Sequence, residues 1–121
     1  MYLLIDAGNS RIKWLYGSSV PGIVEAASYR EDWRTKLWRA WHLLPEPKRI
    51  AMSSVKNDDI VDDVATIADD LWRKPVHVFT AQKETNHTLT VAYEDAALLG
   101  TDRYLAMLGA RSLTHEPLCV V

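Results

Sequence analysis

The sequence has a single cysteine, no long apolar run and no excess of either charge. Cys119 stands alone among 121 residues, so an intramolecular disulfide is excluded and a reducing compartment is expected. The opening apolar run, Met1 to Ile5, is too short for a signal-peptide core or a membrane helix. The net charge of −2 gives no general attraction to nucleic acid or to an anionic membrane. We therefore expect a cytoplasmic protein whose partners include neither nucleic acid nor a membrane.

The composition that is present is that of an ordinary globular domain. Hydrophobic residues make up 48% of the chain and charged residues 25%. A chain of this length can bury a core of its own, and we expect residues 1–116 to form one domain. Residues 117–121 are apolar and contain two valines, like the start of a buried strand. They are therefore expected to open a second domain, which would make this chain a piece of a longer protein.

Apolar periodicity and turn residues predict three leading strands, followed by alternating helices and strands. The expected strands are 2–5, 12–16, 23–29, 50–55, 76–79 and 88–92. The expected helices are 33–44, 57–74 and 101–113, the second of them capped by Asn57 and ended by Pro75. This order is typical of the ribonuclease-H-like, actin-like ATPase domain. The fold class is therefore α/β, with a mixed sheet, a leading three-stranded meander and flanking helices.

A carboxylate, a glycine-containing turn and a lysine follow one another at the end of the first expected strand. Gly8 lets the backbone approach an anion closely, and successive turn N–H groups can bind that anion. Asn9 and Ser10 add donors, and Lys13 could neutralise the charge of a transferring phosphoryl group. Asp6 could hold Mg²⁺ together with phosphate oxygens. The alternative is a solvated hairpin in which these residues serve turn geometry alone.

A second polar group opens the third expected helix. Asp102 lies near the helix N-terminus, whose dipole favours an ionised carboxylate, so it is a candidate general base for phosphoryl transfer. Gly100 allows close approach of the backbone to a ligand, and Arg103 offers a fork for carboxylate or carbonyl oxygens. Tyr93 could supply a hydroxyl or a flat wall. The alternative is that Asp102 only caps the helix and Arg103 is solvated.

Together the two motifs resemble those of type III pantothenate kinases, a family that also includes the Bvg accessory factors. The family opens with Asp-x-Gly-Asn-Thr-x-x-Lys, and residues 6–13 read Asp-Ala-Gly-Asn-Ser-Arg-Ile-Lys, with Ser10 in place of threonine. The family's second motif is Tyr-x-x-Pro-x-x-Leu-Gly-x-Asp-Arg. Residues 93–103 match its spacing throughout, with Ala96 in place of the proline. The resemblance covers essentially the whole chain.

The resemblance implies phosphorylation of pantothenate by ATP to 4′-phosphopantothenate, the first step of coenzyme A biosynthesis. It implies Asp102 as the base toward the primary hydroxyl of pantothenate. The ATP phosphates and the metal would be held by Asp6, Gly8, Asn9, Ser10 and Lys13, with Asp6 at the metal. Pantothenate would be contacted by Tyr93, Gly100, Thr101 and Arg103. Further implied are Mg²⁺, a monovalent cation (K⁺ or NH₄⁺) bound in the second domain, and a homodimer of the full-length protein.

Two other functions are open to the sequence. One is a non-catalytic regulator that keeps the fold and acts by binding a partner. The other is a ribonuclease-H-like nuclease, which would need several carboxylates around paired metals. The aspartates between residues 58 and 70 lie in an expected helix and are interpreted as its solvated face. The four histidines show no metal-ligand spacing. Most of the five tryptophans are expected in the core, whereas Trp38 falls off the apolar stripe of its helix.

Overall fold

The computed structural model describes residues 1–18, 23–55, 58–79, 84–85 and 89–90. The chain forms two compact units, Met1–Phe79 and Thr80–Val121. In the second unit, β6 (Glu84–Thr85) and β7 (Leu89–Thr90) pair antiparallel. The expected helix 101–113, the cap Asn57 and the expected domain boundary near residue 116 lie outside the described residues. That boundary remains a prediction.

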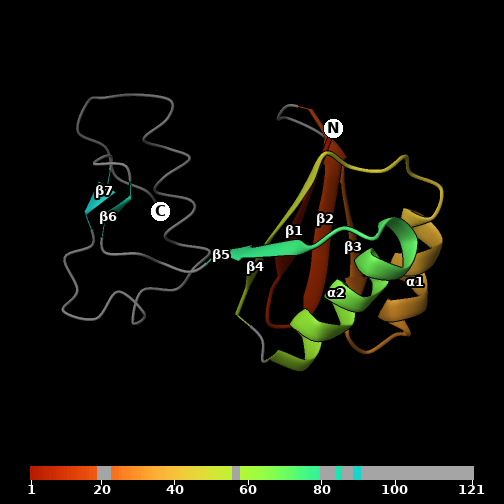
Figure 1. The fold of residues 1–121 in the computed structure, drawn as a ribbon. Coiled ribbons are helices and arrows are strands. Elements are labelled where there is room, and N and C mark those ends of the chain that lie inside the picture. Colours follow the sequence, from red (N-terminus) through yellow and green to blue (C-terminus); the bar gives the residue numbers. More distant parts are fainter. Residues whose placement is uncertain (19–22, 56–57, 80–83, 86–88, 91–121) are drawn as a thin grey trace. The chain divides into compact units, whose positions relative to one another are not determined.

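The first unit is built on a five-stranded mixed sheet (Figure 1). Its strands are β1 (Tyr2–Ala7), β2 (Arg11–Gly17), β3 (Val24–Ser28), β4 (Arg49–Ser54) and β5 (Val76–Phe79). They lie in the order β3-β2-β1-β4-β5. The first three form an antiparallel meander, whereas β4 is parallel to both β1 and β5. This arrangement confirms the predicted fold class.

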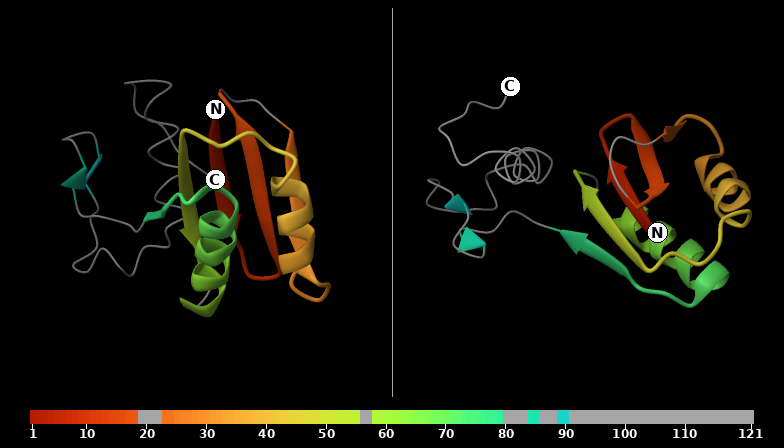
Figure 2. Two further views of the ribbon diagram at one scale, coloured as in Figure 1. Left: turned by 45° about the vertical axis from the view of Figure 1, so that its right-hand side comes forward. Right: turned by 90° about the horizontal axis from the view of Figure 1, so that it is seen from above.

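Both described helices cover the same face of this sheet (Figure 2). Helix α1 (Trp33–Trp41) is capped by Asp32, and hydrogen bonds from the Thr35 hydroxyl and amide lower the pKa of that carboxyl group. Helix α2 (Asp58–Trp72) ends at Trp72, and the next residue, Arg73, adopts a left-handed conformation with φ 52°. Neither of these helices is long and apolar enough to span a membrane.

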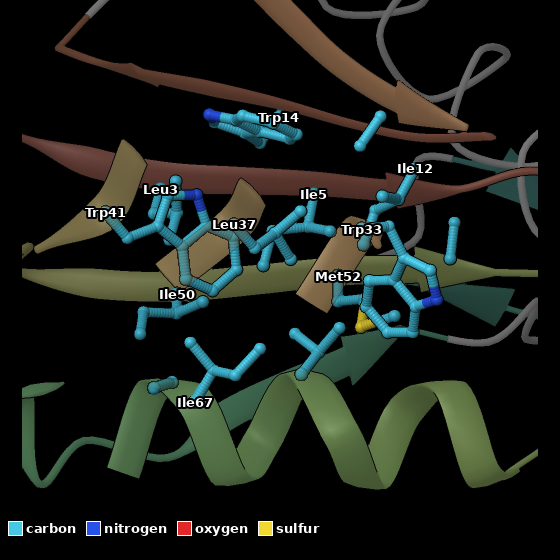
Figure 3. Close-up of a cluster of buried hydrophobic side chains, with 14 residues drawn as sticks. Leu3, Ile5, Ile12, Trp14, Trp33, Leu37, Trp41, Ile50, Met52 and Ile67 are labelled. Carbon is cyan, nitrogen blue, oxygen red and sulfur yellow. The ribbon is translucent and has the colours of Figure 1, made fainter. Parts of the chain in front are cut away.

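The core lies between this face and the two helices (Figure 3). Alternation along the strands turns every second side chain inward. The strand residues of this core are Leu3, Ile5, Ala7, Ile12, Trp14, Ala27, Ile50 and Met52. The helices contribute Trp33, Leu37, Trp41, Val64, Ile67 and Ala68. Trp41 is fully buried, contacting Trp14 edge-on at 6.3 Å between ring centroids and stacking on Trp72 at 6.0 Å. The predicted burial of Trp14, Trp33 and Trp41 is confirmed, as is the exposure of Trp38.

The opposite face of the sheet carries a mixture of polar and apolar side chains. Leu4, Val24 and Phe79 are about half-exposed on it. Asp6 and Lys13 project from this same face, because the residues that flank each of them in its strand point into the core. No described helix covers this face. Ligand-binding groups here are therefore positioned by the strands themselves.

Candidate functional site

The turn between β1 and β2 is tightly closed. Ala7 pairs with Ile12, and the Gly8 amide donates a hydrogen bond of 3.0 Å to the carbonyl oxygen of Arg11. A Cβ atom on residue 8 would lie 3.3 Å from that oxygen. The missing side chain of Gly8 therefore first of all lets the backbone of Arg11 come close to residue 8. Because this amide is already used, an anion bound at the turn would rely on Asn9 and Ser10, which are exposed at its tip.

Asp6 and Lys13 lie directly opposite each other in the β1–β2 pairing. Asp6 is half-buried, whereas Lys13 is exposed. Side chains opposed in this way have their Cβ atoms about 5 Å apart, within easy reach of an ion pair. Yet none of the ion pairs formed by the described residues joins these two groups. Both charges are therefore available to a third group, such as a metal–phosphate complex.

Ser53 completes a row across three strands, because it is the partner of Asp6 in the parallel β1–β4 pairing. Its hydroxyl donates a hydrogen bond of 3.0 Å to Oδ1 of Asp6. This residue is not among those that the sequence motifs single out. The alternation of side chains along residues 50–55 predicts on which face of the sheet Ser53 lies, but not which strand lies beside it. The signal that could have found it is a small polar residue near the carboxyl end of an otherwise apolar strand.

The described residues fit a magnesium ion that is bound mainly through its substrate. They contain no cluster of three or more histidine, cysteine, aspartate or glutamate side chains, so they form no metal cage of protein groups alone. Mg²⁺ typically takes one or two carboxylates and completes its shell with water and phosphate oxygens. Asp6, half-buried and bonded through one oxygen to Ser53, matches that single-carboxylate arrangement.

Two hollows adjoin these residues. One, of about 280 Å³, is lined by Asp6 and Lys13 together with apolar side chains of the open sheet face. The other, of about 640 Å³, lies beside the tip of the β1–β2 turn and is lined by residues 9–11 and 26–30. It includes Arg11 and Arg30 but no acidic residue, so its lining favours an anion.

Tyr29 ties the edge strand to this turn. Its amide donates a hydrogen bond of 3.2 Å to the carbonyl oxygen of Ser10, and its ring packs edge-on against Trp33 at 5.8 Å. Burial of the hydroxyl, and then the negative charge of Asp6, raise the pKa of Tyr29 to about 12. The phenol therefore stays neutral in the folded protein well above its ordinary range.

This shift predicts a loss of stability at high pH. The folded-state pKa of Tyr29 is about 12, whereas a tyrosine in the unfolded chain has its ordinary pKa of 10.0. The contribution of Tyr29 to the free energy of unfolding is therefore complete below pH 10 and is lost as the pH rises toward 12. Solvent screening reduces the loss to the order of 1 kcal/mol. We expect the free energy of unfolding, measured by urea titration from pH 9 to 12, to fall more steeply for the wild type than for Tyr29→Phe.

The exposed Tyr2 supplies the control for this experiment. Tyr2→Phe is expected to follow the wild-type curve. A Tyr29→Phe curve parallel to the wild type throughout would contradict the assignment of the shift to Tyr29.

The second motif lies outside the described residues. This applies to Tyr93, Gly100, Thr101, Asp102 and Arg103. Their expected roles remain predictions. Of the expected site residues, the structure brings Asp6 and Lys13 together, with Gly8, Asn9 and Ser10 in the turn between them.

Comparison with known proteins assigns the chain to a family. The family model described as type III pantothenate kinase matches residues 2–121. A type III pantothenate kinase of Dichelobacter nodosus is 64% identical over the whole chain, which covers 49% of that relative. The enzyme of the same name from Burkholderia lata is 30% identical over 92% of the chain, and the match covers 42% of that relative. The one from Burkholderia mallei is 31% identical over 93% of the chain, and the match covers 43% of that relative. The chain thus spans about half the length of the curated relatives it matches. It belongs to the type III pantothenate kinase family.

Proposed function

We propose that this chain supplies the phosphate-binding half of an enzyme that phosphorylates pantothenate with ATP, giving 4′-phosphopantothenate. The observation that carries the proposal is the family match across residues 2–121. The open charges of Asp6 and Lys13 beside a tight turn support it, because phosphoryl transfer depends mainly on positioning and on charge neutralisation. No observation favours the regulator or the nuclease.

In this proposal the residues of the first motif bind ATP. Asp6 would hold Mg²⁺, whose chemistry there is to neutralise charge on the phosphate oxygens. Lys13 projects from the same face and would contact the transferring phosphoryl group. The turn residues Asn9 and Ser10 would donate to phosphate oxygens. The neighbouring hollow with Arg11 and Arg30 has the charge to hold further anionic groups.

The second motif would bind and activate the acceptor. Asp102 would take the proton of the pantothenate hydroxyl as it attacks the γ-phosphorus, and the bond to ADP breaks on the opposite side. The groups that would orient pantothenate are Tyr93, Gly100, Thr101 and Arg103. A monovalent cation (K⁺ or NH₄⁺), a homodimer and a cytoplasmic location are further parts of the proposal. The isolated 121 residues are expected to turn over far below the normal rate.

The test is pantothenate-dependent release of ADP by a protein of the relatives' full length, with Mg-ATP and K⁺ present. We expect Asp102→Asn to lower kcat by about a hundredfold, because it removes a general base. Asp69→Asn, on the exposed face of α2, is the matched control and should leave kcat unchanged. Absence of pantothenate-dependent ADP release by the wild type would contradict the proposed function, and full activity of Asp102→Asn would contradict the role of Asp102.

A further inference from the structure

Ser53 is the single polar side chain among the buried residues that the structure describes. It is 8% exposed, and the residue before it in β4, Met52, points to the other face of the sheet and belongs to the apolar core. A buried hydroxyl is costly unless it is hydrogen-bonded, and the partner of this one is Oδ1 of Asp6. Alanine would satisfy packing at this position without any such requirement. The presence of serine therefore points to the bond it makes.

The place of this bond in the sheet is also informative. Parallel strands β1 and β4 are neighbours, yet β1 continues to β2 on one side whereas β4 leads through α2 to β5 on the other. The chain thus leaves the carboxyl ends of these two strands in opposite directions. In open α/β sheets, ligands bind in the crevice formed at such a point. Asp6 and Ser53 each lie one residue before the end of these two strands, in register with each other.

We propose that Ser53 is a positioning residue for Asp6. Its hydroxyl occupies one lone pair of Oδ1 and restricts rotation of the carboxylate, so that the remaining lone pairs keep a fixed direction toward the magnesium–ATP complex. This inference rests on the proposed use of ATP, but not on the identity of the acceptor. Groups that orient a metal-binding carboxylate in this way typically change metal affinity or activity by 10- to 100-fold, roughly, when they are removed.

The experiment measures metal–nucleotide binding and catalysis separately, in a protein of the relatives' full length. Binding of Mn²⁺ in the presence of ATP is followed by electron paramagnetic resonance, and kcat and KM for pantothenate by ADP release. Ser53→Ala is expected to weaken Mn²⁺ binding by about tenfold and to leave KM for pantothenate unchanged. Ser53→Thr keeps the hydroxyl and is expected to bind within about threefold of the wild type. Ser18→Ala, at an exposed serine after β2, is the matched control.

Wild-type Mn²⁺ binding by Ser53→Ala would overturn the proposal, as would a Ser53→Thr protein that folds yet binds as weakly as Ser53→Ala. If Ser53→Ala does not fold, as judged by its thermal unfolding, Ser53→Cys decides. A thiol has similar size but is a weak donor, so weakened binding supports the proposal and wild-type binding overturns it. If no variant, including the wild type, releases ADP with pantothenate while Mn²⁺ binding still depends on Ser53, the proposed acceptor is wrong and the role of Ser53 stands.

Discussion

Replacement of Lys13 with methionine is expected to lower kcat for the proposed phosphoryl transfer by about a thousandfold. Lys13 is exposed, faces Asp6 across the β1–β2 pair and enters no ion pair with a described residue. Its charge is therefore uncommitted in the free protein and can act on charge that develops in the transition state. Methionine keeps the length and most of the apolar stem of lysine but removes that charge. The rate is measured as ADP release at saturating ATP and pantothenate.

Lys48→Met is the matched control for this variant. Lys48 is also exposed, but it precedes β4 at the end of the sheet away from the β1–β2 turn. Both variants should keep the wild-type thermal midpoint, because neither side chain belongs to the core. A kcat for Lys13→Met within tenfold of the wild type would show that Lys13 does not contact the transferring group.

Trp41→Ala is expected to destabilise the first unit by about 3–5 kcal/mol, a large share of the stability of a typical domain. The side chain is fully buried and packs against two other tryptophans, Trp14 and Trp72. Its removal would leave a cavity between α1 and the sheet, which a rigid strand face cannot close. The measurement is urea unfolding followed by circular dichroism, since loss of an indole alters the fluorescence signal.

Phenylalanine at the same position gives a sharper comparison. The Nε1–H group of Trp41 is buried and has no hydrogen-bond partner among the described residues. Phenylalanine removes this unsatisfied donor, which stabilises the fold, but it also leaves a small cavity, which destabilises it. The two effects on the free energy of unfolding partly cancel. We expect Trp41→Phe to lower the free energy of unfolding by less than about half as much as Trp41→Ala does. Trp38→Ala, at a half-exposed residue of the same helix, is the control and should cost under about 1 kcal/mol. Equal losses for Trp38→Ala and Trp41→Ala would contradict this account of the core.

Most of the first unit could be predicted from the sequence, because its signals are local. The meander, the two helices and the burial of Trp14, Trp33 and Trp41 follow from periodicity and turn residues. The ends of the helices and strands were predicted less accurately than their existence. The first helix was expected to reach residue 44, but it ends at Trp41, and the next residues form a turn in which the Leu44 amide bonds to the Trp41 carbonyl. That turn competes with one further helical turn, and periodicity does not distinguish them.

The candidate site was predictable only in part, because part of it depends on strand neighbours. Asp6 and Lys13 belong to one hairpin, so their facing positions follow from turn length and alternation. Ser53 comes from a strand far along the chain, and its contact with Asp6 depends on β4 pairing with β1. Pairing of distant strands is a tertiary outcome that local patterns do not encode.

The row formed by Lys13, Asp6 and Ser53 restricts how the length of this chain can vary among its relatives. Each of the three residues comes from a different strand, and they meet only because both pairings hold one register. Side chains alternate faces, so one residue inserted between Tyr2 and Asp6 would move Asp6 to the helix-covered face and bring an apolar neighbour to the ligand side. The same holds for β2 before Lys13 and for β4 before Ser53. We therefore expect alignments of the family to be free of gaps in these strands, and differences in length to fall in the connections between them.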